Sequence, residues 1–134
     1  MDNYDAMGMV ERLAQALDDE DYATARACLE VDAEYDDGAR VIKGADAILQ
    51  SFAESAERGR KTFQRVVFKH ELSVSAPLEI RFIDILMRKG QEFALHHTMR
   101  VALSERGLVK RLQLTLPPGE RERLGHFLRH TADD

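Results

Sequence analysis

The sequence has one cysteine, three prolines and no long hydrophobic run, and each scarcity excludes a class of structure. With Cys28 alone, the chain can form neither an internal disulfide nor a cluster of thiolate metal ligands. Ala25, Cys28 and Leu29 share one face at helical spacing, so we expect Cys28 to pack in the core. No apolar stretch approaches the ~20 residues of a membrane-spanning helix. We therefore expect no membrane partner.

Basic residues are in the minority. The chain has 19 lysines and arginines against 24 aspartates and glutamates, for a formal net charge of −5 at pH 7. Nucleic-acid binding needs a basic surface that neutralises phosphates, and the basic windows 57–61 and 121–130 are short and interrupted. We expect no nucleic acid as a partner. The acidic first residues, 1–8, do not resemble a signal peptide, so we expect a cytoplasmic protein.

Signatures of common catalytic and cofactor sites are also missing from the sequence. It contains no glycine-rich phosphate loop, and no serine or cysteine stands in a nucleophile motif. The adjacent His96 and His97 would project to opposite faces of a strand, which is the wrong geometry for both to hold one metal ion. We therefore expect neither a metal nor a cofactor.

The length of 134 residues suits one domain, and we assign 1–134 to it. Asp21 is placed to cap a helix at its start, and Gly59 to end one. Apolar residues at helical spacing predict helices near 7–17, 22–29 and 45–56.

A change of period follows Lys61. The apolar spacing falls from about 3.6 residues to about 2, which indicates strands. Four strands are predicted in the segments 63–76, 78–90, 91–105 and 108–116. Two shorter strands flank the turn Asp36-Asp37-Gly38. The antiparallel meander has an apolar face that the helices must cover, so the fold class is α+β. Residues 117–134 form an extension with a final helix begun by proline.

The order helix, helix, two strands, helix, four strands resembles the nuclear transport factor 2-like superfamily, in its ketosteroid isomerase and SnoaL-like polyketide cyclase branch. The most specific match is "ALDDEDYATARACLEVDAEYDDGARVIKGADAIL", residues 16–49, and the resemblance extends from about Val10 to Leu116. It implies a cone-shaped α+β barrel. In that fold a curved, mostly antiparallel sheet wraps around the long third helix and leaves a hydrophobic pocket at the wide end.

The resemblance also suggests site residues. Asp37 falls at the position of the isomerases' proton-shuttling aspartate, with Asp36 as a competitor because the loop before Gly44 is shorter. His97 falls where the isomerases keep a protonated aspartic acid, and Leu13 where they keep the oxyanion tyrosine. Because Leu13 has no hydroxyl, the two-donor oxyanion hole of ketosteroid isomerase is not reproduced, and we predict no steroid isomerisation.

Polar residues that lie on apolar strand faces are candidate catalytic or ligand-binding residues. His97 shares a face with Leu95 and Met99, so it should point inward, where imidazole can both donate and accept protons near neutral pH. Asp84 interrupts another apolar face, and a lone buried carboxylate is costly without a partner. We predict Asp37, His97 and Asp84 as catalytic residues. We expect ligand contacts from Tyr35, His70, Phe52, Phe82 and Met99, with Tyr35 as a candidate replacement hydroxyl donor.

Each catalytic candidate has a structural alternative. His97 could be a core histidine satisfied by a local partner, and Asp37 could serve only the turn with Gly38. Asp84 could face outward, because its strand is apolar on both sides. The second apolar face carries Ile83, Ile85 and Met87, and the resemblance implies a homodimer through this outer face of the sheet.

Three functions remain open from the sequence. The first is a cofactor-independent isomerase, cyclase or dehydratase that acts on a small apolar molecule by general acid/base catalysis. The second is a module that binds such a molecule without turning it over. The third is an adaptor whose cone is filled by side chains and whose surface binds protein. We rank the first two nearly equal and the third below them.

Overall fold

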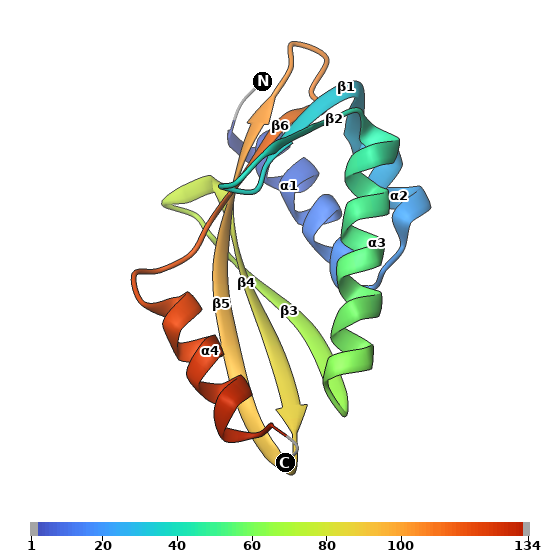
Figure 1. Ribbon diagram of the computed structural model, residues 1–134. Helices are drawn as coiled ribbons and strands as arrows, with labels where there is room; N and C mark the ends of the chain where they lie inside the picture. Colours follow the sequence, from blue (N-terminus) through green and yellow to red (C-terminus); the bar gives the residue numbers. More distant parts are fainter. Residues whose placement is uncertain (1–2, 133–134) are drawn as a thin grey trace.

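A curved six-stranded sheet and four helices make up the computed structural model, which describes residues 3–132 (Figure 1). This confirms the α+β class, and the last two residues of the predicted 117–134 extension lie outside the described residues. The elements follow in the order α1 (Asn3–Asp18), α2 (Tyr22–Cys28), β1 (Leu29–Asp36), β2 (Val41–Lys43), α3 (Ala45–Thr62), β3 (Arg65–Ser73), β4 (Ala76–Arg88), β5 (Gln91–Leu103), β6 (Val109–Thr115) and α4 (Glu120–His130).

The sheet has the order β2-β1-β6-β5-β4-β3. All neighbouring strands are antiparallel except β1 and β6, which run parallel, so the sheet is mostly antiparallel as the resemblance implied. The two longest strands, β4 and β5, are joined by Lys89 and Gly90 alone, and both residues have positive φ, 53° and 74°. A two-residue turn with both φ angles positive matches the right-handed twist of the strands it joins.

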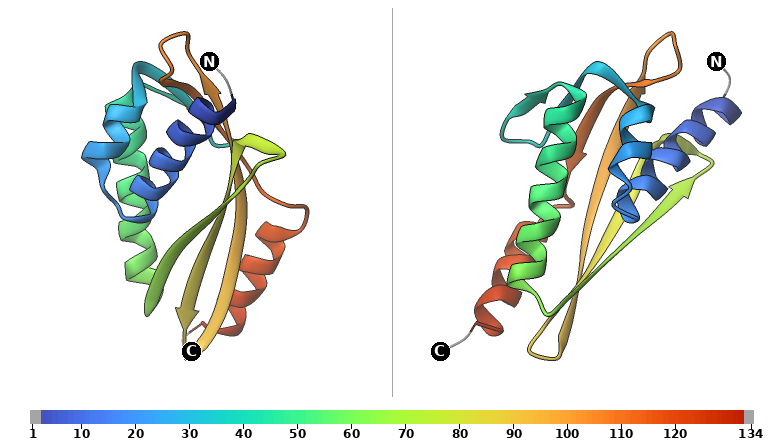
Figure 2. Two further views of the ribbon diagram at one scale, coloured as in Figure 1. Left: turned by 180° about the vertical axis from the view of Figure 1, so that it is seen from behind. Right: turned by 90° about the vertical axis from the view of Figure 1, so that its right-hand side faces the viewer.

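The helices α1 and α3 lie against the inner face of the sheet (Figure 2). The apolar stripe of each helix packs on the inner face of the sheet. Along each strand the side chains point alternately to the inner and the outer face, and the inward ones are buried against the helices. Fully buried members of this core include Leu13 from α1, Ile48 from α3, Ile80 from β4 and Leu112 from β6. Among the described residues, no helix is both long and apolar enough to cross a membrane.

Two predicted helix boundaries are wrong. Gly59 does not end the third helix: α3 continues to Thr62, and the Gly59 carbonyl accepts the N–H of Phe63. Arg60 and Lys61 suit this last turn because they oppose the negative end of the helix dipole. The final helix is not begun by proline either, since α4 starts at Glu120, after Gly119. The predicted cap at Asp21 is confirmed, because its carboxylate accepts the N–H of Thr24.

Helix α4 covers an otherwise unpaired edge of β5. Strand β6 pairs with the second half of β5, from Thr98 onward, so the first half lacks a strand on that side. The Glu120 carboxylate accepts the backbone N–H of His96 at 2.7 Å, and the ring of Phe127 stacks on that of Phe93. The helix therefore satisfies the backbone N–H of His96 and covers a strand edge to which another strand would otherwise be able to pair.

Candidate functional site

An apolar cavity of about 270 Å³ lies between α3, the end of α1 and the inner face of β3, β4 and β5. The long helix forms one wall and the curved strands the other, while Leu124 of α4 closes part of the rim. Most of the lining is hydrophobic, with Phe52, Phe68, Phe82, Leu86, Leu95 and Met99 among its residues. Space of this kind, with a few polar groups in it, is typical of a site for a small molecule.

Asp84 and His97 are two of those polar groups. The strand register places Phe82 of β4 opposite His97 of β5, and Asp84 follows Phe82 on the same face. The Nε2 atom of His97 lies 3.2 Å from Oδ2 of Asp84, and both side chains are less than one-fifth exposed. The imidazole also stacks on the Phe82 ring, with centroids 5.4 Å apart. Strand pairing and stacking together fix the orientation of the imidazole.

The contact with Asp84 selects one tautomer of His97. An ionised carboxylate only accepts hydrogen bonds, so with Asp84 ionised Nε2 carries the proton and donates a hydrogen bond to Asp84. The other nitrogen, Nδ1, is buried and has no hydrogen-bond partner within the described part of the chain. His97 thus orients the carboxylate, and Asp84 keeps a second oxygen at the cavity wall.

A second carboxylate–imidazole pair, Asp18 with His70, adjoins the first. Asp18 ends α1 and lines the same cavity. Its Oδ2 lies 2.5 Å from Nδ1 of His70 on β3, and the side chains are 9% and 13% exposed. His70 was expected to contact a ligand directly, but it lies behind Asp18 and outside the residues that line the cavity. Asp18 is not among the residues predicted from the sequence, although it continues the helical stripe of Val10 and Ala14 at a spacing of four residues.

Burial sets the protonation of Asp18. The Oδ1 atom is buried without a hydrogen-bond partner within residues 3–132. Desolvation raises the pKa of Asp18, the hydrogen bond and charge of His70 oppose this, and the nearby charges of Asp19 and Asp84 raise it further. The carboxyl group therefore holds its proton to higher pH than an exposed aspartate does.

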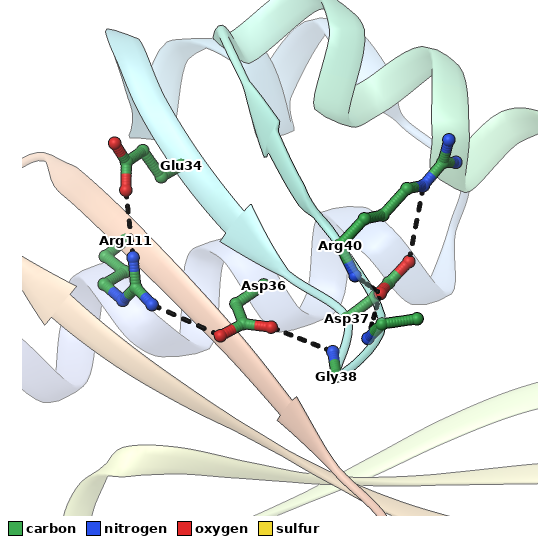
Figure 3. Close-up of polar contacts among 7 residues, drawn as sticks. Glu34, Asp36, Asp37, Gly38, Arg40 and Arg111 are labelled. Atoms are coloured by element: carbon green, nitrogen blue, oxygen red, sulfur yellow. Dashed lines mark hydrogen bonds and ion pairs between the residues drawn. The ribbon is translucent and has the colours of Figure 1, made fainter.

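Asp37 lies elsewhere, in the turn between β1 and β2 (Figure 3). Its Oδ1 accepts the N–H groups of Ala39 and Arg40 at 2.8 and 2.9 Å, and these bonds lower the pKa of Asp37. It is not among the cavity-lining residues, which differs from the inward position expected from the resemblance. Asp36 accepts the N–H of Gly38 and pairs with Arg111, so both carboxylates of the turn are engaged locally.

The remaining predicted contact residues divide into two groups. Phe52, Phe82 and Met99 line the cavity. Tyr35 does not: it is buried one layer behind, where its ring meets that of Phe52 edge-on at 4.9 Å. Burial and the charges of Asp37 and Asp36 raise the pKa of Tyr35 to about 12, so its hydroxyl stays protonated at neutral pH. Among the described residues, no three His, Cys, Asp or Glu side chains are grouped to hold a metal ion.

The sequence matches no family model and no curated protein. Solved structures are similar in fold. Bal32a, from a soil-derived mobile gene cassette, is 17% identical with a TM-score of 0.67, over 86% of this chain and 91% of that one. An LEH-like epoxide hydrolase of M. tuberculosis is 17% identical with a TM-score of 0.64, over 95% of this chain and 96% of that one. SalBIII, an epoxide hydrolase/cyclase-like enzyme of pyran ring formation in salinomycin, is 10% identical with a TM-score of 0.65, over 89% and 95%.

The raised pKa of Asp18 predicts a pH-dependent effect of Asp18→Asn on stability. The stability that Asp18 confers is fully present below the ordinary pKa of 3.8 and is lost as pH rises through the raised value of the folded protein. Asparagine does not titrate. The free energy of unfolding of Asp18→Asn relative to wild type should therefore increase as the pH rises above about 4.

Urea unfolding at a series of pH values measures this difference. Asp32→Asn is the matched control, because Asp32 is an exposed aspartate on β1 and does not contribute to the pKa shift of Asp18. An Asp18→Asn profile that stays parallel to wild type over this range would contradict the assignment of a raised pKa to Asp18.

Proposed function

Since the chain has the nuclear transport factor 2-like fold, we propose that its cavity binds a small apolar molecule and acts on it by general acid/base catalysis, as an isomerase, cyclase or dehydratase. The observation that carries the proposal is the Asp84–His97 pair on the wall of an otherwise apolar cavity. The fold alone does not choose a reaction, because function resides in the site.

In the proposed reaction Asp84 is the base. Its free oxygen accepts a proton from a hydroxyl or an acidic carbon of the ligand, while Nε2–H of His97 stabilises the carboxylate. Asp18, whose raised pKa lets it keep its proton to higher pH than an exposed aspartate, is the acid and donates to the ligand oxygen that gains negative charge. Asp84 takes up one proton from the ligand and Asp18 releases one to it, and no electrons are transferred to or from the ligand, so the step is redox-neutral. The apolar walls strengthen both interactions by excluding water.

Ring closure or opening at an oxygen atom fits this arrangement well. It requires deprotonation of an attacking hydroxyl and protonation of a leaving oxygen, which two separate carboxyl groups can perform. Two structural neighbours support this class, since one is described as an epoxide hydrolase/cyclase-like enzyme and another as an LEH-like epoxide hydrolase. The second candidate function is binding without turnover, which is favoured by the absence of a hydroxyl at Leu13.

The test is turnover of small hydroxy-epoxides and enolisable ketones by purified protein. Asp84→Asn should lower the rate by about 10²–10⁴-fold, as removal of a general base does. His97→Gln should lower it less, because glutamine can still donate a hydrogen bond. Asp37→Asn should leave the rate unchanged, because Asp37 lies in the turn.

Other outcomes discriminate between the candidates. A loss in Asp37→Asn equal to that in Asp84→Asn would support the original assignment of Asp37 and contradict the one made from the cavity. Stabilisation of the wild type by several of these compounds, with no turnover of any, would contradict catalysis and support binding alone.

We also propose a homodimer through the outer face of β3 and β4. Ile83, Ile85 and Met87 are only half-buried there, and a shallow hollow beside them is lined by Val67, Ile85 and Met87. Arg65, Lys69 and Glu92 at its edge offer charges of both signs, which two copies can pair. Apolar patches rimmed by polar residues are typical of such interfaces.

Sedimentation equilibrium should give the mass of a dimer for the wild type and of a monomer for Ile85→Lys, because the lysine would bury a charge at the contact. Val74→Lys is the matched control, since Val74 is 83% exposed in the turn between β3 and β4. A monomeric wild type would contradict the proposed dimer.

A further inference from the structure

We propose that the natural ligand of this cavity is a small apolar amine, bound as an ammonium ion. This inference rests on the proposed function for the location of the site and adds the charge class of the molecule that enters it. Its basis is the combination of carboxylates and aromatic rings around one space.

Acidic groups dominate the polar lining. Asp18, Glu20 and Asp84 line the cavity, whereas His97 is the one basic side chain among the lining residues that the structure describes. No lysine or arginine is included in that described lining. Glu20 pairs with Arg60 of α3 at the rim, but the other two carboxylates have only imidazoles as partners. Acidic side chains therefore outnumber basic ones in the described lining, and ionisation of Asp84 or Asp18 gives the interior a negative potential.

Asp18 and Asp84 are close enough in the cavity lining to interact electrostatically. The two carboxylates line the same cavity, and the charge of Asp84 is one of the smaller causes that raise the pKa of Asp18. A carboxylate or phosphate ligand would add a further negative charge and increase the repulsion. An ammonium group would pair with ionised Asp84 and could donate a second hydrogen bond to Asp18. The same charge pattern thus excludes anions and favours cations.

The aromatic lining points the same way. Five aromatic side chains border the cavity: Tyr22, Phe52, Phe63, Phe68 and Phe82. The face of an aromatic ring attracts a cation, and more strongly when water is excluded. The rings also supply apolar surface for the carbon skeleton of the ligand. At about 270 Å³ the space is slightly smaller than the roughly 300 Å³ at which drug-sized pockets begin, so the amine is small.

Three molecules of matched shape test the charge class: benzylammonium, benzyl alcohol and benzoate. Calorimetric titration of the wild type near pH 7 should show benzylammonium binding about tenfold or more tightly than benzyl alcohol, with no binding of benzoate. Asp84→Asn should abolish the preference for the amine, and Asp18→Asn should weaken it. Asp37→Asn is the control of equal charge change and should retain the preference, because Asp37 lies outside the cavity lining.

The outcomes separate this inference from the proposed function. Equal binding of benzylammonium and benzyl alcohol would overturn the charge class and leave a cavity for apolar molecules, as the proposed function requires. A preference for the amine that persists in Asp84→Asn would also overturn the inference, since the cation would then bind elsewhere. Failure of benzylammonium to bind would overturn it outright, whereas the turnover assay tests the proposed function with other compounds.

Discussion

The need to partner carboxylates in an apolar cone is the constraint on which this structure depends. An ionised carboxylate is unstable among phenylalanine and leucine side chains unless it accepts hydrogen bonds or takes up a proton. The protein uses one imidazole for each of the two inner carboxylates, His70 for Asp18 and His97 for Asp84. The partnering is incomplete, because Oδ1 of Asp18 and Nδ1 of His97 are buried without a partner in the described chain. Incomplete satisfaction of this kind is expected at a functional site rather than in a passive core.

The fold brings these groups together from distant parts of the chain. Asp18 and His70 are separated by 52 residues and meet because the end of α1 packs over β3 and β4. Asp84 and His97 meet because the tight turn at Lys89 and Gly90 sets the register of the hairpin. A shift of that register by one residue would turn one member of the pair to the outer face. Backbone geometry far from the cavity therefore fixes the chemistry inside it.

Strand periodicity predicted most of the fold and part of the site, while tertiary contacts decided the rest. Alternation predicted the inward direction of His97, whereas that of Asp84 stayed open because its strand is apolar on both sides, and the pairing of Phe82 with His97 decided it. Asp18 was hidden in the acidic stretch "LDDED", which resembles a solvated helix end, and its partner His70 is not local. Asp37 was expected to face inward by positional resemblance. In the shorter loop, Oδ1 of Asp37 instead accepts the turn amides of Ala39 and Arg40.

The protonation of the two inner imidazoles tests this account most directly. Long-range ¹H–¹⁵N correlation NMR at about pH 8, above the ordinary histidine pKa of about 6.5, reports which ring nitrogen carries the proton. The account predicts opposite states: Nδ1 of His70 protonated, because it donates to Asp18, and Nδ1 of His97 bare, because Nε2 donates to Asp84. The account would be contradicted if both rings showed the same tautomer, or if both exchanged between the two tautomers like the exposed His126. The carboxylate–imidazole pairs would then not exist in solution, and the proposed chemistry would lose its basis.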